Sequence, residues 1–279
     1  MQSITQQRLL EINRHFYATV AGEFDRSRAG LPAGWAQLAP WLPISNEPLL
    51  GSEPLYVLDA GCGNGRFARW LEAQARPIEY IGVDGDATLL QYATRNSQPL
   101  THVHPTFDQA DLTPPAWPQT RASLPPASLP PASLPLASCP LPPASLPPAP
   151  FPLITCFAVL HHLPGYDLRR RLLRTLAGLL APEGRLILSN WQFLTSTRFA
   201  QKQIDWQTIG LSVAEVEQEL EPGDALLPWQ QGGYAVRYVH QVDEAEMNQL
   251  ADDVGLQVAH SFYADGKEGR LNLYSILRR

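Results

Sequence analysis

The segment spanning residues 55–67, LYVLDAGCGNGRF, constrains the fold of this chain more than any other. Its apolar run ends in Asp59, and three glycines then occupy alternate positions before a helical pattern begins. This order predicts a buried strand, a tight turn and the N-terminus of a helix. Glycines at such a turn let a ligand lie against bare backbone, which a Cβ would block.

Two further acids follow strand-like segments. Asp84 ends the apolar run 80–84, and Asp111 follows a strand expected over residues 102–107. An acid at the end of the second strand of such a sheet hydrogen-bonds ribose hydroxyls. A helix is predicted over residues 87–96. The glycine loop alone could be explained by a tight turn that needs glycine only for packing. Acids that follow three successive strands favour a ligand site instead.

The spacing of the glycines separates two ligand classes. A dinucleotide fingerprint is G-x-G-x-x-G, whereas this chain has D-x-G-x-G-x-G, with Arg66 where the last glycine would fall. The pattern resembles the first motif of the class I S-adenosylmethionine methyltransferases. That resemblance implies an α/β, Rossmann-like fold with a seven-stranded, mostly parallel sheet and helices on both faces. A nicotinamide-dependent dehydrogenase is the alternative that the spacing disfavours.

The resemblance also implies that S-adenosylmethionine is the cofactor. Asp84 would accept its ribose hydroxyls, and Asp111 would meet its adenine amino group. Tyr17 and the segment 24–28 resemble the helix through which the family's chain enters the domain. The residues expected to contact the cofactor are Tyr17, Arg28, Asp59, Gly61, Gly63, Asp84, Asp111, Leu112 and Phe157.

The domain organisation follows from composition along the chain. Residues 1–50 are expected to form an N-terminal helical cap that contains an amphipathic helix over residues 5–20. Residues 51–279 are expected to form the methyltransferase domain, interrupted by a proline-rich, low-complexity loop at 114–150. The loop repeats the pentapeptide ASLPP, and proline removes backbone donors that a sheet or helix needs. We interpret it as a tolerated repeat expansion, with a docking arm for a proline-recognising partner as the alternative.

The second half of the domain continues the alternation of strands and helices. A continuous apolar run at 153–160 predicts a central parallel strand, which His161 follows directly. Further strands are expected over 185–189, 256–263 and 270–277, and helices over 167–180, 196–210, 212–220 and 242–254.

Two C-terminal motifs narrow the resemblance. GDALLPW at 223–229 and RYVH at 237–240 are similar to segments of the eukaryotic tRNA wobble-uridine methyltransferases, which esterify a carboxymethyl group on uridine. The resemblance implies tRNA as the acceptor. A carboxylate nucleophile is already ionised and needs orientation, for which we select Arg237, Tyr238 and His240. His161 is a candidate general base for a hydroxyl or amine acceptor.

Overall charge leaves other acceptors open. The formal net charge of −6 gives no global attraction to nucleic acid. A small-molecule O- or N-methyltransferase is therefore the first alternative, and a non-catalytic methyltransferase-like binding protein is the second. A small activating subunit is a partner that no sequence pattern would reveal.

Cysteine usage and hydropathy indicate the compartment. The three cysteines lack metal-site spacing and do not indicate a disulfide framework, so no metal is expected. No signal peptide or membrane-length apolar run is evident. The chain is therefore expected to be cytoplasmic, without a membrane partner.

We predict that deleting residues 122–150 leaves stability and cofactor affinity nearly unchanged, because the repeat cannot form core structure. Thermal unfolding and cofactor titration of the deletion variant, beside the full chain, measure both quantities. Loss of cooperative melting would show instead that the segment packs on the fold.

Overall fold

The computed structural model describes residues 1–43, 54–120, 122–123, 150–231 and 233–279. Most of the proline-rich segment, residues 124–149, lies outside the described residues, so the interpretation of its repeat stays a prediction. None of the described helices combines the length and the apolar character needed to cross a bilayer.

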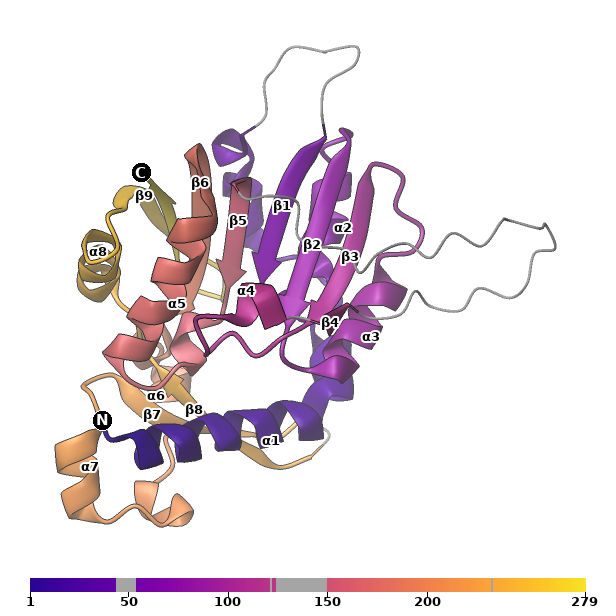
Figure 1. Ribbon diagram of the computed structural model, residues 1–279. Coiled ribbons are helices and arrows are strands. Elements are labelled where there is room, and N and C mark those ends of the chain that lie inside the picture. Colours follow the sequence, from indigo (N-terminus) through magenta and orange to yellow (C-terminus); the bar gives the residue numbers. More distant parts are fainter. Residues whose placement is uncertain (44–53, 121, 124–149, 232) are drawn as a thin grey trace.

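One sheet with the strand order β4-β3-β2-β1-β5-β6-β10-β9 forms the centre of the molecule (Figure 1). Strands β3, β2, β1, β5 and β6 pair in parallel, and β10 is antiparallel to β6 and β9. Apart from the two-residue β4, this is the predicted seven-stranded, mostly parallel sheet. The strands are β1 (Leu55–Ala60), β2 (Ile78–Asp84), β3 (Val103–Gln109), β4 (Ala122–Ser123), β5 (Phe151–Phe157), β6 (Leu180–Trp191), β9 (Gln257–Ala264) and β10 (Asn272–Arg278).

Helices cover both faces of the sheet. Alternate residues of β1 enter different cores: Leu58 packs with helices α5 and α8, whereas Val57 packs with α2 and α3. This two-residue period is why the central strands are apolar throughout. The α-helices are α1 (Ser3–Ser27), α2 (Arg66–Glu72), α3 (Ala87–Asn96), α4 (Trp117–Thr120), α5 (Tyr166–Leu179), α6 (Thr197–Ala200), α7 (Val213–Glu219) and α8 (Glu244–Asp252). Short 3-10 helices are η1 (Ala33–Gln37), η2 (Ala39–Trp41), η3 (Leu160–His162), η4 (Phe193–Thr195) and η5 (Trp206–Ile209).

Most element predictions are confirmed, and one helix prediction is wrong. Helix α3 spans the predicted residues, and Asp86 caps it by accepting from the Leu89 N–H at 2.9 Å. The continuous helix expected over 196–210 is instead the four-residue α6, an extended stretch and η5. The chain leaves the helical path there because Ile204 forms a β-bridge with Leu226.

A lid lies across the carboxyl ends of the parallel strands. It consists of α1 and an antiparallel hairpin formed by β7 (Asp224–Trp229) and β8 (Ala235–His240) (Figure 1). Leu9, Phe16 and Val20 of the predicted apolar stripe are buried against this hairpin.

Polar side chains fix α1 near its middle and near its end. The buried Asn13 accepts from the Tyr238 N–H at 2.9 Å and donates to the His162 carbonyl at 3.0 Å. Farther along, Asp25 accepts from Asn64 at 2.9 Å and Asn96 at 2.8 Å. Because a buried amide is costly to leave unpaired, Asn13 sets the position of α1 over the strand ends.

Candidate active site

A cavity of about 980 Å³ lies between the carboxyl ends of the strands and the lid. Its walls include the ends of β1, β2, β5 and β6, helix α1 and the β7–β8 hairpin. Ligands of parallel α/β sheets bind at this edge, and the volume is at the large end for small-molecule pockets.

The glycine loop serves both packing and access. Both Gly61 and Gly63 have positive φ, at +82° and +55°. A Cβ on Gly61 would lie 2.2 Å from a Val159 methyl carbon, so this glycine permits close packing of β1 on the turn after β5. A Cβ on Gly63 would meet nothing nearer than Phe24 at 4.0 Å. Gly63 therefore leaves bare backbone on the cavity wall, as expected of a ligand cradle.

Asp84 is held with its carboxylate at the cavity. Its two oxygens accept from the Gly63 and Asp86 N–H groups, both at 2.9 Å. Burial raises its pKa, although these two hydrogen bonds oppose the shift. A carboxylate has about four acceptor positions, so roughly two remain for a pair of ligand hydroxyls.

Asp59 borders the cavity but is engaged inside the sheet. It is 2% exposed and accepts from the Tyr80 hydroxyl at 2.5 Å and from Thr155 at 2.7 Å. Burial raises its pKa to about 6 against these two hydrogen bonds. Asp59 thereby joins the ends of β1, β2 and β5 in the wall of the site.

Tyr17 of α1 and Arg28, which directly follows this helix, are two of the predicted residues. The Tyr17 hydroxyl lies 2.7 Å from Nε2 of His162, and the Arg28 guanidinium lies 5.0 Å from the centre of the Phe24 ring. Burial raises the pKa of Tyr17 to about 12 and lowers that of Arg28. Across the cavity, Asp111 forms a 3.1 Å ion pair with Arg14 of α1.

The structure thus brings together every residue that the sequence assigns to the cofactor. All nine line this one cavity, including Leu112 and Phe157. Their individual contacts with a cofactor stay predictions. An open glycine wall beside an acid with free acceptor positions suits a ribose-containing ligand with a cationic centre.

Arg237 is the most unusual charge in the site. It is 8% exposed, lines the cavity from β8, and its Nε has no hydrogen-bond partner. Its Cζ lies 4.5 Å from the ring centre of Trp191, 5.2 Å from that of Phe16 and 5.8 Å from that of Trp229.

No acid among the described residues pairs with Arg237. Burial lowers its pKa only to about 10, so it stays protonated at neutral pH. A buried cation without a counter-ion is costly, and a ligand anion in the cavity would compensate it. Sequence reasoning selected Arg237 but missed its three aromatic neighbours, of which Trp229 ends the 223–229 motif.

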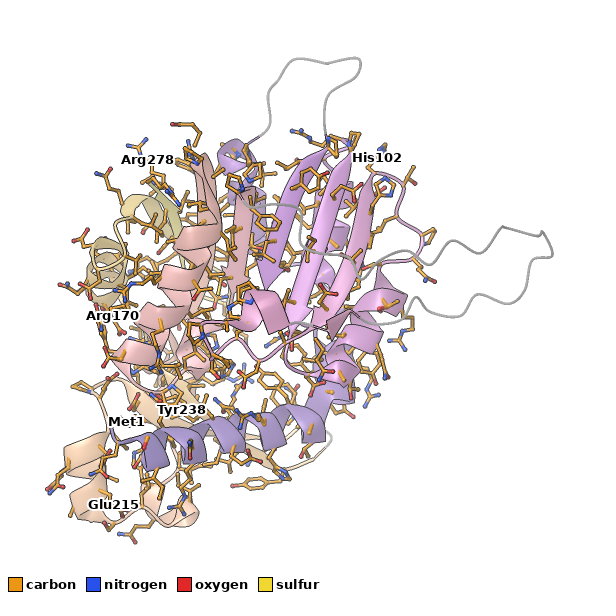
Figure 2. The ribbon with its side chains drawn as sticks, in the orientation of Figure 1. Met1, His102, Arg170, Glu215, Tyr238 and Arg278 are labelled. Atoms are coloured by element: carbon orange, nitrogen blue, oxygen red, sulfur yellow. The ribbon has the colours of Figure 1, made fainter. Side chains whose placement is uncertain are left out.

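Tyr238 and His240 do not line the cavity, which corrects their predicted placement. Successive side chains of a strand alternate between its faces, so the residues next to Arg237 and Val239 point away from the cavity. Tyr238 lies beside α1 (Figure 2) and donates to Asp224 at 2.6 Å. His240 is 2% exposed and contacts two carboxylates, Asp224 and Glu246, each at 2.7 Å.

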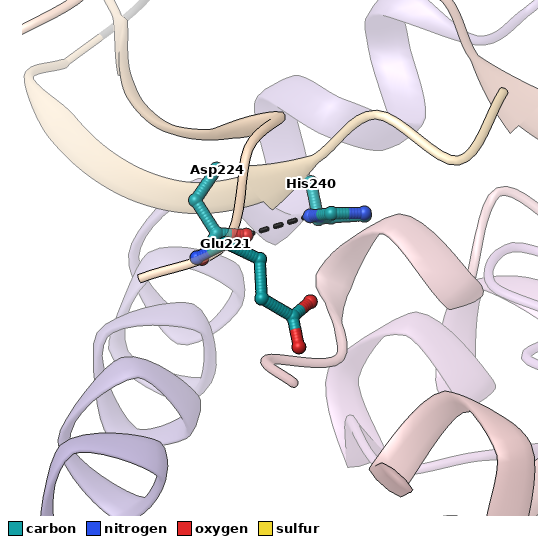
Figure 3. Close-up of side chains that lie close together, drawn as sticks. All are labelled: Glu221, Asp224 and His240. Atoms are coloured by element: carbon teal, nitrogen blue, oxygen red, sulfur yellow. Dashed lines mark hydrogen bonds and ion pairs between the residues drawn. The ribbon is translucent and has the colours of Figure 1, made fainter. Parts of the chain in front are cut away.

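These side chains belong to a buried ion network that secures the hairpin. Arg169 of α5 pairs with Glu221 at 2.5 Å and with Glu246 of α8 at 2.7 Å. Figure 3 shows Glu221, Asp224 and His240, whose polar atoms lie close enough together to hold a metal ion. Their carboxylate oxygens already accept hydrogen bonds from protein donors. We therefore interpret the cluster as a structural network between the hairpin and helices α5 and α8.

The two histidines after β5 both line the cavity, His161 buried and His162 half-buried, although only His161 was selected from the sequence. Burial lowers the pKa of His161 far below its usual value and that of His162 to about 3, so both are neutral. Nδ1 of His161 accepts from the Trp191 N–H at 3.5 Å, which leaves the ring proton on Nε2. His161 is therefore neutral at the cavity, and its role as general base stays a prediction.

Comparison with known proteins places the chain in a family. A model of the methyltransferase domain family matches residues 27–261, so the chain belongs to that family. No curated protein sequence matches it. The sheet order, the glycine loop and this match define the class: the chain is an S-adenosylmethionine-dependent methyltransferase.

Solved structures show the same fold. An S-adenosylmethionine-dependent methyltransferase from Methanosarcina mazei has a TM-score of 0.56 and 17% identity, with 85% of this chain and 99% of that chain covered. The magnesium protoporphyrin IX methyltransferase from Synechocystis PCC 6803, crystallised with bound S-adenosylmethionine, has a TM-score of 0.54 and 18% identity, with 97% of each chain covered. An amino pentose methyltransferase from Micromonospora echinaspora has a TM-score of 0.51 and 17% identity, with 93% of this chain and 97% of that chain covered.

Asp84→Ala is expected to weaken S-adenosylmethionine binding by about 2–4 kcal/mol, because hydrogen bonds to a charged group contribute about 1.5–3 kcal/mol each and water replaces part of them. Calorimetric titration measures the change. Asp252→Ala is the control, because it removes an exposed carboxylate on α8 that does not line the cavity. Unchanged affinity in a folded Asp84→Ala variant would remove this acid from the site.

His240 predicts a stability loss at alkaline pH. Burial opposes its protonation, but the hydrogen bonds to Asp224 and Glu246 outweigh burial and raise its pKa above 6.5. The network's stabilisation is therefore complete below about pH 6.5 and is lost as pH rises through the folded-state value. The melting temperature should therefore fall over that interval.

Variants separate this effect from other titrations. His240→Gln should lower the melting temperature at pH 6.5 and flatten its fall above that pH, whereas the exposed His15→Gln should change neither. His161 and His162 affect stability in the opposite sense, because their pKa values are lowered in the folded state. Their protonation destabilises the fold as pH falls below about 6.5 and has no effect above it. An unchanged slope in His240→Gln would contradict the assignment.

Proposed function

We propose that this methyltransferase esterifies a carboxylate on its acceptor. The observation that carries the proposal is Arg237, a buried cation on the cavity wall for which the described residues supply no counter-ion. Any acceptor must pass this guanidinium, and an anionic group is the chemistry that compensates it. A planar guanidinium also orients a carboxylate through two parallel hydrogen bonds.

The surrounding residues suit this chemistry. S-adenosylmethionine supplies the activated methyl group when bound. Three aromatic rings restrict the Arg237 side chain, so the guanidinium is preorganised before the acceptor arrives. Nε2–H of His161, beside Trp191, is available as a neutral donor. An ionised carboxylate needs no general base. This agrees with the lowered pKa values of His161 and His162, which make both rings weak bases.

A carboxymethylated wobble uridine in tRNA is the leading acceptor of this class. Its support is the similarity of segments 223–229 and 237–240 to the tRNA methyltransferases, because these segments supply Trp229 and Arg237. A small carboxylic acid is the second candidate. It is favoured by the net charge of −6 and by a lid that covers the strand ends.

Arg237→Lys tests the carboxylate assignment. An ammonium cannot reproduce the bidentate fork, so kcat/KM for a carboxylate acceptor should fall at least roughly tenfold, or about 1.4 kcal/mol of transition-state stabilisation. Cofactor affinity should not change. The measurement is transfer of a labelled methyl group to carboxymethylated tRNA and, in parallel, to a panel of small carboxylic acids.

The control is Arg171→Lys, which alters an exposed arginine on α5. Full activity of Arg237→Lys on every carboxylate acceptor would exclude the role of the guanidinium. Labelling of small acids but not of tRNA by the native chain would assign the second candidate.

A further inference from the structure

Two further cationic residues line the same cavity, in addition to Arg237. Arg198 of α6 and Lys202, just beyond it, both line the cavity and are exposed to solvent. Among the described residues neither forms an ion pair. The amide side chains of Gln230 and Gln231, at the end of the hairpin strand β7, border the same region.

A row of rings connects Arg198 to the buried Arg237. The Arg237 guanidinium lies 4.5 Å from the Trp191 ring centre, and the Trp191 and Phe199 ring centres are 4.7 Å apart. The Arg198 guanidinium lies 5.2 Å from the Phe199 ring centre. Only two aromatic rings therefore separate the buried cation from the exposed one along this row.

The charges of the cavity are divided between its two halves. Every carboxylate among its described lining residues comes from the ends of β1, β2 and β3 or from the turn between β9 and β10. None comes from β6, α6 or the hairpin, which supply Arg198, Lys202 and Arg237. Arg198, Lys202 and Arg237 thus form a group of cations on the acceptor side of the cavity for which the described residues supply no carboxylate partner.

We infer that Arg198 and Lys202 form a phosphate subsite, so that the acceptor is a nucleotide with its carboxylate at Arg237 and a phosphate at the cavity mouth. This inference rests on the proposed carboxylate acceptor. A phosphate matches two exposed cations because it offers several acceptor oxygens and a full negative charge. The Trp191 and Phe199 rings, which lie between the two charges, give this part of the cavity wall an apolar surface for a base.

The test compares four ligands: uridine, uridine 5′-monophosphate, carboxymethyluridine and carboxymethyluridine 5′-monophosphate. Their dissociation constants are measured calorimetrically with S-adenosylhomocysteine present. In the native chain, the phosphate should increase affinity at least roughly tenfold, or about 1.4 kcal/mol, on both bases. The double variant R198Q/K202Q should reduce that preference to less than about threefold. The matched control R171Q/R278Q, which removes two exposed cations that do not line the cavity, should leave it unchanged.

The four ligands also separate this inference from the proposed function. Arg237→Lys should remove the preference for the carboxymethyl group and keep the preference for phosphate. Equal affinity for phosphorylated and unphosphorylated ligands, no binding of the phosphorylated ones, or a preference that survives in R198Q/K202Q would each overturn the phosphate subsite. A phosphate preference without a carboxymethyl preference would support the subsite and refute the carboxylate acceptor.

Transfer RNA distinguishes the source of the phosphate. If it belongs to an RNA chain, the slope of log Kd against log salt for tRNA should fall by about 0.7–0.9 in R198Q/K202Q, because the two cations contact one phosphate. An unchanged tRNA slope, together with a lost preference among mononucleotides, would assign the subsite to a free nucleotide.

Discussion

The parallel alignment of β3, β2, β1, β5 and β6 is the constraint on which the site depends. Parallel strands bring all their carboxyl ends to one edge, and the chain must cross that edge each time it leaves a strand. The Gly61–Gly63 turn, Asp84 and the histidines after β5 therefore meet although they are far apart in sequence. Asp59 strengthens this edge because its hydrogen bonds to Tyr80 and Thr155 join three neighbouring strands.

The lid converts this open edge into a cavity, and two polar arrangements hold it. Asn13 joins α1 to β8 and to the turn after β5. The network of Arg169, Asp224, His240 and Glu246 ties the hairpin to α5 and α8. Because β8 alternates its side chains, anchoring Tyr238 and His240 on one face fixes Arg237 on the other. Burial of the unpaired Arg237 charge is unfavourable, and the network offsets this by holding β8 in place.

Charge is distributed so that the two halves of the cavity select different chemistry. The acids at the ends of β1, β2 and β3 suit a cofactor with hydroxyls and a cationic centre. The cations on α6 and β8 suit an anionic acceptor. Arg28, which directly follows α1, lies close enough to Arg237 that its charge lowers the pKa of Arg237, which favours anions at this end.

The sequence by itself determined the sheet, the glycine turn and the residues of the cofactor half. Those features follow from local patterns: apolar runs of strand length, glycines at a turn, and an acid directly after each strand. The glycine turn and the acids lie at strand ends, and the order of strands and helices along the chain places those ends at one edge of the sheet. The helix expected over 196–210 failed because Ile204 pairs with Leu226, a partner that local sequence does not indicate.

Only the tertiary structure decided which residues of the RYVH segment face the acceptor. The sequence grouped Arg237, Tyr238 and His240, but strand alternation places only the first on the cavity, and distant partners on α5 and α8 bind the other face. The aromatic surroundings of Arg237 come from α1, β6 and β7, which meet only on folding. Sequence therefore determined which chemical groups are present. Tertiary packing decided which of them are neutralised inside the protein and which are left for a ligand.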